Sequence, residues 1–230
     1  MMRREHESYA AGPFAFMPRL IACEDDAERP LLIIEDLSGA EWPPPWTRAR
    51  FDAVRAAIAA MHACEVPAPR KVSELRAAIR GWTLVAEDPA PFLSLSVADA
   101  AWLKANLPAL LAAEQACEQE GDAFTHFDLR SDNMCVTLGG AKLVDWAEAC
   151  RSNPKLDLGS WAPSLEYEGG PKPEELVGHE PEVAAVISGY FAARAGLPLI
   201  PDAPRVRDVQ KRQLSTALPW VIRALRLPTP

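Results

Sequence analysis

Residues 134–146, MCVTLGGAKLVDW, constrain the fold of this chain more than any other segment. Apolar residues alternate on both sides of Gly139-Gly140, and a Gly-Gly pair is a two-residue turn signal, so the pattern predicts a β-hairpin. Residues 123–129, AFTHFDL, predict a short strand that enters a loop immediately before the hairpin. A strand, a loop and a tight hairpin therefore stand together in the middle of the chain.

The segments on both sides of this hairpin are mainly helical in pattern. In residues 47–63, apolar residues from Phe51 to Met61 recur at helical spacing, and Thr47 can act as the N-cap. Further helices are predicted over 3–11 with a stop at Gly12-Pro13, over 73–86, from about 97 to 119, and over most of the chain from 155 onward, with proline-rich joints at 171–173 and 197–204.

The N-terminal part carries the other strand signal. Residues 31–39, LLIIEDLSG, are an apolar run followed by two acids and a Ser-Gly turn, which predicts a buried strand that leaves the core. The stretch WPPPW at 42–46 cannot form regular structure and is interpreted as a rigid link. We therefore place a domain boundary beside it, between residues 1–41 and residues 42–230.

Composition and charge exclude several classes of protein. The chain has 230 residues, enough for one large domain or two small ones, and its net charge is −8. That charge argues against a nucleic-acid partner or an anionic membrane surface, because both need a basic face. No apolar run approaches the roughly 20 residues of a membrane span, and the N-terminus lacks the apolar core of a signal peptide. Five scattered cysteines without a Cys-x-x-Cys pair favour reduced thiols, so we expect a cytoplasmic protein.

The loop and the hairpin together carry three side chains suited to phosphoryl transfer. Asp128 starts the stretch DLRSDN, Asn133 ends it, and Asp145 follows the apolar end of the hairpin. A hydroxyl acceptor needs a carboxylate that orients it and takes its proton, which Asp128 can supply. Magnesium prefers carboxylate and amide oxygens, which Asn133 and Asp145 can supply from the two sides of the hairpin. The alternative is that Asp128 and Asn133 only cap and brace a loop.

The pattern H-x-D-x-x-x-x-N, followed by a hairpin and Asp-Trp, resembles the aminoglycoside phosphotransferase and choline kinase-like family, which is related to protein kinases. The resemblance implies an α+β, protein kinase-like fold with a catalytic loop at 126–133 and a metal-binding segment at 143–147. It also implies ATP, or another nucleoside triphosphate, and Mg as cofactors. The partner would be a small-molecule hydroxyl acceptor of the aminoglycoside, choline or amino-alcohol type.

The resemblance carries over to individual residues of the loop and hairpin. Asp128 matches the catalytic aspartate of the family, and Asn133 and Asp145 match its metal ligands. His126 matches the loop histidine, which is structural rather than chemical. Asp157 in the stretch LDLGSW resembles the downstream aspartate that braces the catalytic loop.

Other matches carry less chemical information. LLIIEDLSG resembles the strand and hinge behind the adenine, where Glu35 to Leu37 would meet the base through backbone groups. AIAAMHA resembles the helix that ends in a histidine, and we assign His62 itself to packing or to the surface. Arg130 lies two residues after Asp128, where a phosphate contact and a simple salt bridge are both open. Five acids could line a pocket for a cationic acceptor or form a solvated face: Glu148, Glu166, Glu168, Glu174 and Glu175.

The sequence departs from the family pattern at its start. The glycine-rich turn and the lysine on the next strand have no counterpart, since the first glycine is Gly12 and the first lysine is Lys71. Glu5 resembles the helix glutamate that pairs with that lysine, so we expect the chain to begin within this helix. The predicted architecture is a truncated small N-terminal lobe with the hinge, followed by a mainly α-helical C-terminal lobe. An apolar patch at Leu31–Ile34 would then invite self-association.

The departure leaves three explanations open. The first is a start placed too late or a truncated product. The second is a protein that binds a ligand without transferring phosphate. In the third, Arg130 and the metal ions alone hold the nucleotide. We favour the first, because the catalytic loop is complete. The alternative functions are a non-catalytic nucleotide- or ligand-binding relative and a metal-dependent phosphohydrolase, in which the hinge-like segment would have no purpose.

Overall fold

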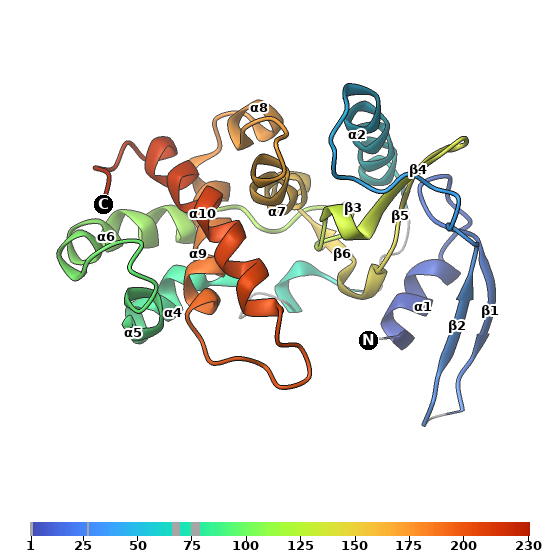
Figure 1. The fold of residues 1–230 in the computed structure, drawn as a ribbon, viewed down its shortest axis with the longest axis horizontal. Coiled ribbons are helices and arrows are strands. Elements are labelled where there is room, and N and C mark those ends of the chain that lie inside the picture. The colour runs from blue at the N-terminus through green and yellow to red at the C-terminus, as the bar shows by residue number, and fades with distance from the viewer. Residues whose placement is uncertain (1, 27, 66–69, 75–78) are drawn as a thin grey trace. The chain divides into compact units, whose positions relative to one another are not determined.

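The computed structural model describes residues 2–26, 28–65, 70–74 and 79–230, and the chain forms two compact units (Figure 1). The first unit combines Met1–Ser73 with Gln119–Trp161, and the second combines Glu74–Glu118 with Ala162–Pro230. Each unit is built from two separate stretches of chain, and the chain passes from one unit to the other after Ser73, Glu118 and Trp161. None of these positions is the boundary predicted near residue 42. That lobe boundary stays a prediction.

The first unit holds the strands and the second is helical. The first contains α1 (Met2–Ala10), β1 (Leu20–Glu24), β2 (Leu31–Ile34), α2 (Arg48–His62), β3 (Ala123–Thr125), η2 (Ser131–Asn133), β4 (Met134–Thr137), β5 (Gly140–Leu143), η3 (Trp146–Glu148), β6 (Cys150–Ser152) and the start of α7 (Pro154–Tyr167). The second contains the end of α7, α4 (Gly81–Glu87), α5 (Ala90–Leu93), α6 (Ala100–Ala116), α8 (Pro173–Val177), α9 (Pro181–Ala195) and α10 (Val206–Ala224). The short turn η1 (Val72–Glu74) lies at the junction.

The predicted hairpin is confirmed, but its turn lies one residue earlier than expected. Strands β4 and β5 pair antiparallel with Thr137 opposite Gly140, so Leu138 and Gly139 form the turn and Gly140 belongs to β5. The Thr137 hydroxyl accepts from the Gly139 N–H at 3.1 Å and donates to the Gly140 carbonyl at 2.9 Å. These two bonds close the turn, and Leu138 is exposed to solvent. Gly140 has a φ of 111°, a positive value that glycine tolerates.

Helix α2 packs on this hairpin and forms the core of the first unit. Thr47 is its N-cap and accepts from the Arg50 N–H at 3.3 Å, as predicted. Its apolar face, which includes the fully buried Val54 and Met61, packs against β3, β4 and β5. An aromatic cluster completes the core, with Phe124 stacked on Trp146 at 5.5 Å between ring centres.

In the second unit, α9 is the central helix and packs against α4, α5, α6 and α10. Gly81 of α4 and Gly189 of α9 touch so closely that a Cβ on Gly81 would lie 1.9 Å from the Gly189 carbonyl. The buried Glu114 carboxylate of α6 accepts from the backbone N–H groups of Trp82 at 2.7 Å and Thr83 at 3.0 Å. It thereby satisfies donors that the first turn of α4 would otherwise leave unpaired.

Several expectations about secondary structure are corrected. Strand β2 exists but is not buried, because 47% of Leu31 and 41% of Ile33 are exposed on a ladder that has only two strands among the described residues. The helix predicted over 73–86 appears only as α4 and the preceding η1, and residues 75–78 lie outside the described ranges. Strands β1 and β6 and the short α5 were not predicted. Self-association through Leu31–Ile34 stays a prediction.

The remaining helices agree with the sequence. Helices α1 and α6 lie where predicted, and the C-terminal part is helical with joints at the expected prolines. None of the helices in the described ranges is long and apolar enough to cross a membrane.

The contact between Gly81 and Gly189 generates a prediction about stability. Replacing Gly81 with alanine forces α4 and α9 apart, because the new Cβ would meet backbone atoms that cannot move aside. We expect Gly81→Ala to lower the free energy of unfolding by about 3 kcal/mol, measured by urea denaturation. Gly139→Ala is the matched control, because its nearest neighbour would be at 3.7 Å. Equal stability of the two variants would contradict the close packing of α4 on α9.

Candidate functional site

The loop at 126–133 leaves β3 and returns into β4 through the turn at Ser131–Asn133. Asn133 is 5% exposed, and its side-chain nitrogen donates to the Asp128 carbonyl at 2.9 Å and to Asp128 Oδ2 at 3.1 Å. The Asp128 side chain is only half-buried, with 37% exposed. The amide nitrogen of Asn133 is thus committed to Asp128, and its amide oxygen is the atom suited to a metal ion.

The hairpin places Asp145 beside Asn133. Met134 pairs with Leu143 in the β4–β5 ladder, and one step further the Val144 N–H donates to the Asn133 carbonyl at 2.9 Å. Asp145 follows with φ 62° and ψ 64°, a left-handed conformation that is unusual for a residue with a Cβ. The two predicted metal ligands therefore sit at adjacent strand ends. Their role as ligands stays a prediction.

Helix α1 supports the metal-binding segment. The Glu5 carboxylate accepts from the backbone N–H groups of Asp145 and Trp146, and the Ser8 hydroxyl donates to the Trp146 carbonyl at 3.2 Å. Burial, followed by the nearby Asp145 charge, raises the pKa of Glu5. Glu5 thus contacts backbone of the site, and its expected pairing with a lysine stays a prediction.

His126 joins the loop to the same segment. Its ring is fully buried, with Nε2 2.8 Å from the Val144 carbonyl and Nδ1 3.3 Å from the Asp128 N–H. A carbonyl only accepts and an amide N–H only donates, so the contacts assign the proton to Nε2 and leave Nδ1 as an acceptor. The ring also packs on Trp146 at 4.6 Å between centres. These contacts hold the His126 ring between the loop and the metal-binding segment, and its purely structural role stays a prediction.

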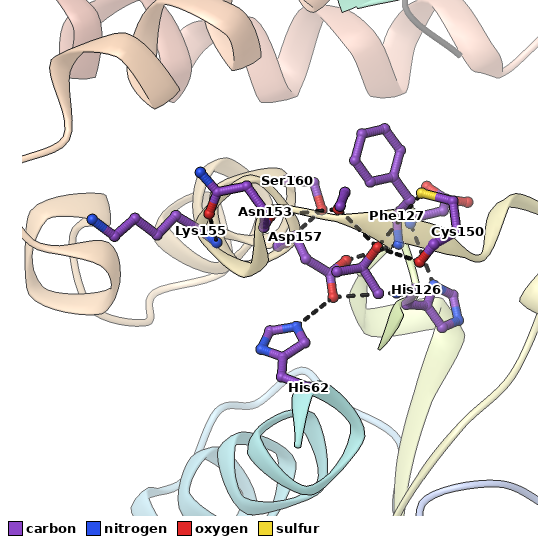
Figure 2. A network of polar contacts seen from close by, with 11 residues as sticks. His62, His126, Phe127, Cys150, Asn153, Lys155, Asp157 and Ser160 are labelled. Atoms are coloured by element: carbon purple, nitrogen blue, oxygen red, sulfur yellow. Dashed lines mark hydrogen bonds and ion pairs between the residues drawn. The ribbon is translucent and has the colours of Figure 1, made fainter. Parts of the chain in front are cut away.

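Asp157 braces the loop from the first turn of α7. Its carboxylate is fully buried and accepts from the Phe127 N–H at 2.7 Å and the His126 N–H at 3.2 Å (Figure 2). Phe127 has a φ of 65°, which a bulky residue adopts only when its surroundings hold it there. Asp157 therefore contacts the backbone of the loop, and its importance for the activity of that loop stays a prediction.

His62 belongs to this network, and the sequence analysis missed it. Its Nε2 lies 2.8 Å from Asp157 Oδ2 (Figure 2). Only 13% of its side chain is exposed. The available signal was a histidine at the end of an apolar helix face, directly after the buried Met61. That signal does not name a partner, because Asp157 lies 95 residues further along the chain.

Arg130 is engaged by an acid on its own loop. Its Nε and Nη2 lie 2.9 Å and 2.5 Å from the Asp132 carboxylate, whereas Nη1 is 3.9 Å from Asp128 Oδ1. The hydrogen bond with Asp132 raises the pKa of Arg130 and lowers that of Asp132. The structure therefore contains the salt bridge considered from the sequence, and a phosphate contact by Arg130 stays a prediction.

The hinge-like residues continue the β1–β2 ladder. The Glu35 N–H donates to the Arg19 carbonyl at 2.8 Å, and Glu35 Oε2 accepts from the Arg19 N–H at 3.1 Å. The Leu37 carbonyl accepts from the Ala40 N–H at 3.0 Å. Lys142 of β5 lies beside this segment, with Nζ 4.0 Å from Glu35 Oε2. These bonds fix the backbone over 35–40 next to the hairpin strand.

The donor set at Asn133 and Asp145 fits magnesium. Within the ranges that the structure describes, no group of three or more His, Cys, Asp or Glu could hold a metal ion. Magnesium does not need such a cage, because it commonly binds one or two protein oxygens together with nucleotide phosphates and water. One amide oxygen and one carboxylate, both hard ligands, meet that requirement.

Most of the acids considered for a cationic pocket have other partners. Glu174 pairs with Arg223 at 2.7 Å, and Glu175 accepts from the Lys172 N–H at 3.1 Å at the start of α8. Glu148 lies 3.8 Å from Arg4. These contacts account for three of the five acids without an acceptor. Burial raises the pKa of a fourth, Glu166.

Comparisons with known proteins give one family and a set of similar structures. The model of the "Phosphotransferase enzyme family" matches residues 2–213. A thermostable mutant of aminoglycoside phosphotransferase APH(4)-Ia, in ternary complex with AMP-PNP and hygromycin B, is 14% identical with a TM-score of 0.60, over 97% of this chain and 81% of that chain. No curated protein matches the sequence.

Two structures named as choline or choline/ethanolamine kinases resemble this chain about as well as the aminoglycoside phosphotransferase does. A choline/ethanolamine kinase family protein from Mesorhizobium loti is 18% identical with a TM-score of 0.59, over 97% of this chain and 79% of that chain. Choline kinase LicA from Streptococcus pneumoniae is 12% identical with a TM-score of 0.57, over 98% and 80%. At these identities the likeness concerns the fold.

The packing of α1 generates a prediction at Tyr9. Its ring is 4% exposed and its hydroxyl has no hydrogen-bond partner in the described residues, while burial, Glu5 and Asp145 together raise its pKa. An unsatisfied buried hydroxyl destabilises a fold, so Tyr9→Phe should raise the free energy of unfolding by about 1 kcal/mol in urea. Tyr167→Phe, at a site that is 51% exposed, should have no effect. A loss of stability in Tyr9→Phe would show that the hydroxyl has a partner.

Proposed function

The chain belongs to the phosphotransferase enzyme family, and we propose that it transfers the γ-phosphoryl group of ATP, or of another nucleoside triphosphate, to a hydroxyl group of a small molecule. The similar structures share the α+β, protein kinase-like fold predicted from the sequence. The observation that carries the proposal is the bond from Asn133 to Asp128 together with the backbone bond from Val144 to Asn133. These bonds support a single site made of the proposed base, Asp128, and the two proposed metal ligands, Asn133 and Asp145.

Asp128 acts as the base of the proposed reaction. Asn133 holds Oδ2 at 3.1 Å, and the half-exposed carboxylate can still accept a proton from an incoming hydroxyl. The acceptor oxygen bonds to the γ-phosphorus, its proton passes to Asp128, and the bond from the γ-phosphorus to the bridging oxygen breaks. The nucleoside diphosphate leaves with that oxygen. The Asn133 contact fixes the direction in which the carboxylate points.

Asn133 Oδ1 and the Asp145 carboxylate would hold Mg, which neutralises charge on the phosphates when bound. Asp145 keeps its left-handed backbone because Glu5 accepts from its N–H and from that of Trp146. Helix α1 thus orients Asp145, the proposed metal ligand, before any nucleotide binds. Arg130 lies 3.9 Å from Asp128 and would contribute positive charge near the transferred group, in competition with its bond to Asp132.

The hinge-like segment would hold the base of the nucleotide. The Glu35 N–H is bonded to the Arg19 carbonyl, and the Leu37 carbonyl accepts from the Ala40 N–H. The Glu35 carbonyl and the Leu37 N–H would therefore be the backbone groups that meet the base. The similar APH(4)-Ia structure contains AMP-PNP and hygromycin B, which supports a nucleotide and a hydroxyl-bearing small molecule as the two substrates.

A second candidate is nucleotide or ligand binding without transfer. It is favoured by the place of Glu5, whose carboxylate accepts from the backbone N–H groups of Asp145 and Trp146. The complete set of Asp128, Asn133 and Asp145 favours transfer. A phosphohydrolase remains the least favoured function, since it would not need a hinge.

The role of Asp128 can be tested by turnover. We expect Asp128→Asn to lower kcat by about 100-fold or more with Mg-ATP and a panel of aminoglycoside, choline-like and amino-alcohol acceptors, because the proton acceptor is lost. Nucleotide affinity, measured by calorimetry, should change by no more than about twofold. Asp122→Asn, with a fully exposed side chain before the same loop, is the control. Unchanged turnover in Asp128→Asn would reject the proposed chemistry, and binding without turnover in the wild type would favour the second candidate.

The role of Asp145 is tested by metal binding. Asp145→Asn keeps the shape of the side chain and removes its charge, so the affinity for Mn²⁺ in the presence of nucleotide should fall by about tenfold or more. Electron paramagnetic resonance of Mn²⁺ measures this without turnover. Asp122→Asn, at a fully exposed side chain outside the loop, keeps the metal-binding oxygens and should retain the wild-type affinity. An equal loss in the two variants would mean that Asp145 is no ligand.

A further inference from the structure

We infer that His62 is a positioning residue for the proposed catalytic loop and acts through the buried carboxylate of Asp157. The expected effect of His62 on turnover rests on the proposed function, whereas its effect on the loop backbone does not. The underlying geometry is a contact of 2.8 Å between His62 Nε2 and Asp157 Oδ2, which joins the end of α2 to the first turn of α7 (Figure 2).

The Asp157 carboxylate needs His62 because it is fully removed from water. A buried carboxylate is stable only when donors surround it. Three donors are in place: the Phe127 N–H at 2.7 Å on Oδ1, and the His126 N–H at 3.2 Å and His62 Nε2 at 2.8 Å on Oδ2. His62 is the only side chain of the three, so it is the donor that a substitution can remove.

The loop needs Asp157 because its backbone is strained next to the catalytic candidate. Phe127 has a φ of 65°, and Asp128 is the next residue. A residue with a Cβ holds this conformation only when several contacts impose it. The two bonds from the His126 and Phe127 amides to Asp157 are those contacts, and a shift of the carboxylate would turn the peptide that carries Asp128.

Helix α2 fixes where His62 can be. His62 is the last residue of the helix, and the preceding residue Met61 is fully buried against the hairpin side of the unit. The ring has little freedom, since 13% of its side chain is exposed. The apolar face of α2 fixes the position of the helix and so of His62. His62 in turn fixes the Asp157 carboxylate, which holds the loop.

His62 does not reach the reacting atoms. It contacts the loop through Asp157, whereas His126 joins the loop to the metal-binding segment at the Val144 carbonyl. The loop is therefore held from two sides by two histidines. Loss of His62 should misplace Asp128 while the nucleotide-binding groups at Glu35 and Asp145 stay in place, so kcat and nucleotide KM should respond differently.

The test compares His62→Ala, His62→Gln and His179→Ala in the full chain. Glutamine keeps an N–H donor at a reach similar to that of Nε2, and His179 is an exposed histidine that serves as the matched control. Hydrogen exchange of the His126 and Phe127 amides, urea denaturation and steady-state kinetics are measured for each. In His62→Ala we expect the two amides to exchange about tenfold faster, kcat to fall about tenfold and the nucleotide KM to change by no more than about twofold. His62→Gln should recover most of each loss.

Other results would overturn the inference. Unchanged exchange at His126 and Phe127 in His62→Ala would show that His62 does not hold the loop. A uniform rise in exchange along the whole chain, with lower stability and no recovery in His62→Gln, would show that the histidine only anchors the end of α2. If the wild type turns over no acceptor, the proposed function fails, and amide exchange alone decides whether His62 positions the loop.

Discussion

The carboxylate of Asp157 is the interaction on which the candidate site depends. It is fully buried, and the cost of burying a charge is offset by the backbone N–H groups of His126 and Phe127 and by His62. These donors come from the loop after β3 and from α2, so the one carboxylate of α7 joins three segments of the first unit. The strained backbone at Phe127 is a consequence of that arrangement.

A second strained residue lies on the metal side of the site. Asp145 is also left-handed, and it is held by the Glu5 carboxylate of α1 and, one residue on, by the bond from Ser8 to the Trp146 carbonyl. Each conformation costs of order 1–3 kcal/mol, so both need surroundings that impose them. The stacking of Trp146 on Phe124 and its contact with His126 join these two regions through a packed core.

The helical unit uses the same physical solution away from the site. Glu114 is buried and accepts from the first turn of α4, where Trp82 and Thr83 present backbone donors. In both units a buried acid, Asp157 or Glu114, would cost free energy if it were unpaired. Each instead accepts hydrogen bonds from backbone N–H groups and so fixes the backbone near it. Buried acids of this kind specify one arrangement, because any shift leaves a charge without its donors.

The sequence by itself determined what depends on near neighbours. The hairpin, the Thr47 cap of α2 and the spacing of Asp128, Asn133 and Asp145 follow from local pattern, and they were enough to predict the fold class and the family. Tertiary structure decided the rest: the pairing of β6 with β3, the exposure of β2, and the partners of Glu5 and His62. Local pattern does not name the donor that satisfies a buried acid: for Asp157 one donor is His62, 95 positions earlier in the chain, and only the folded chain brings the two together.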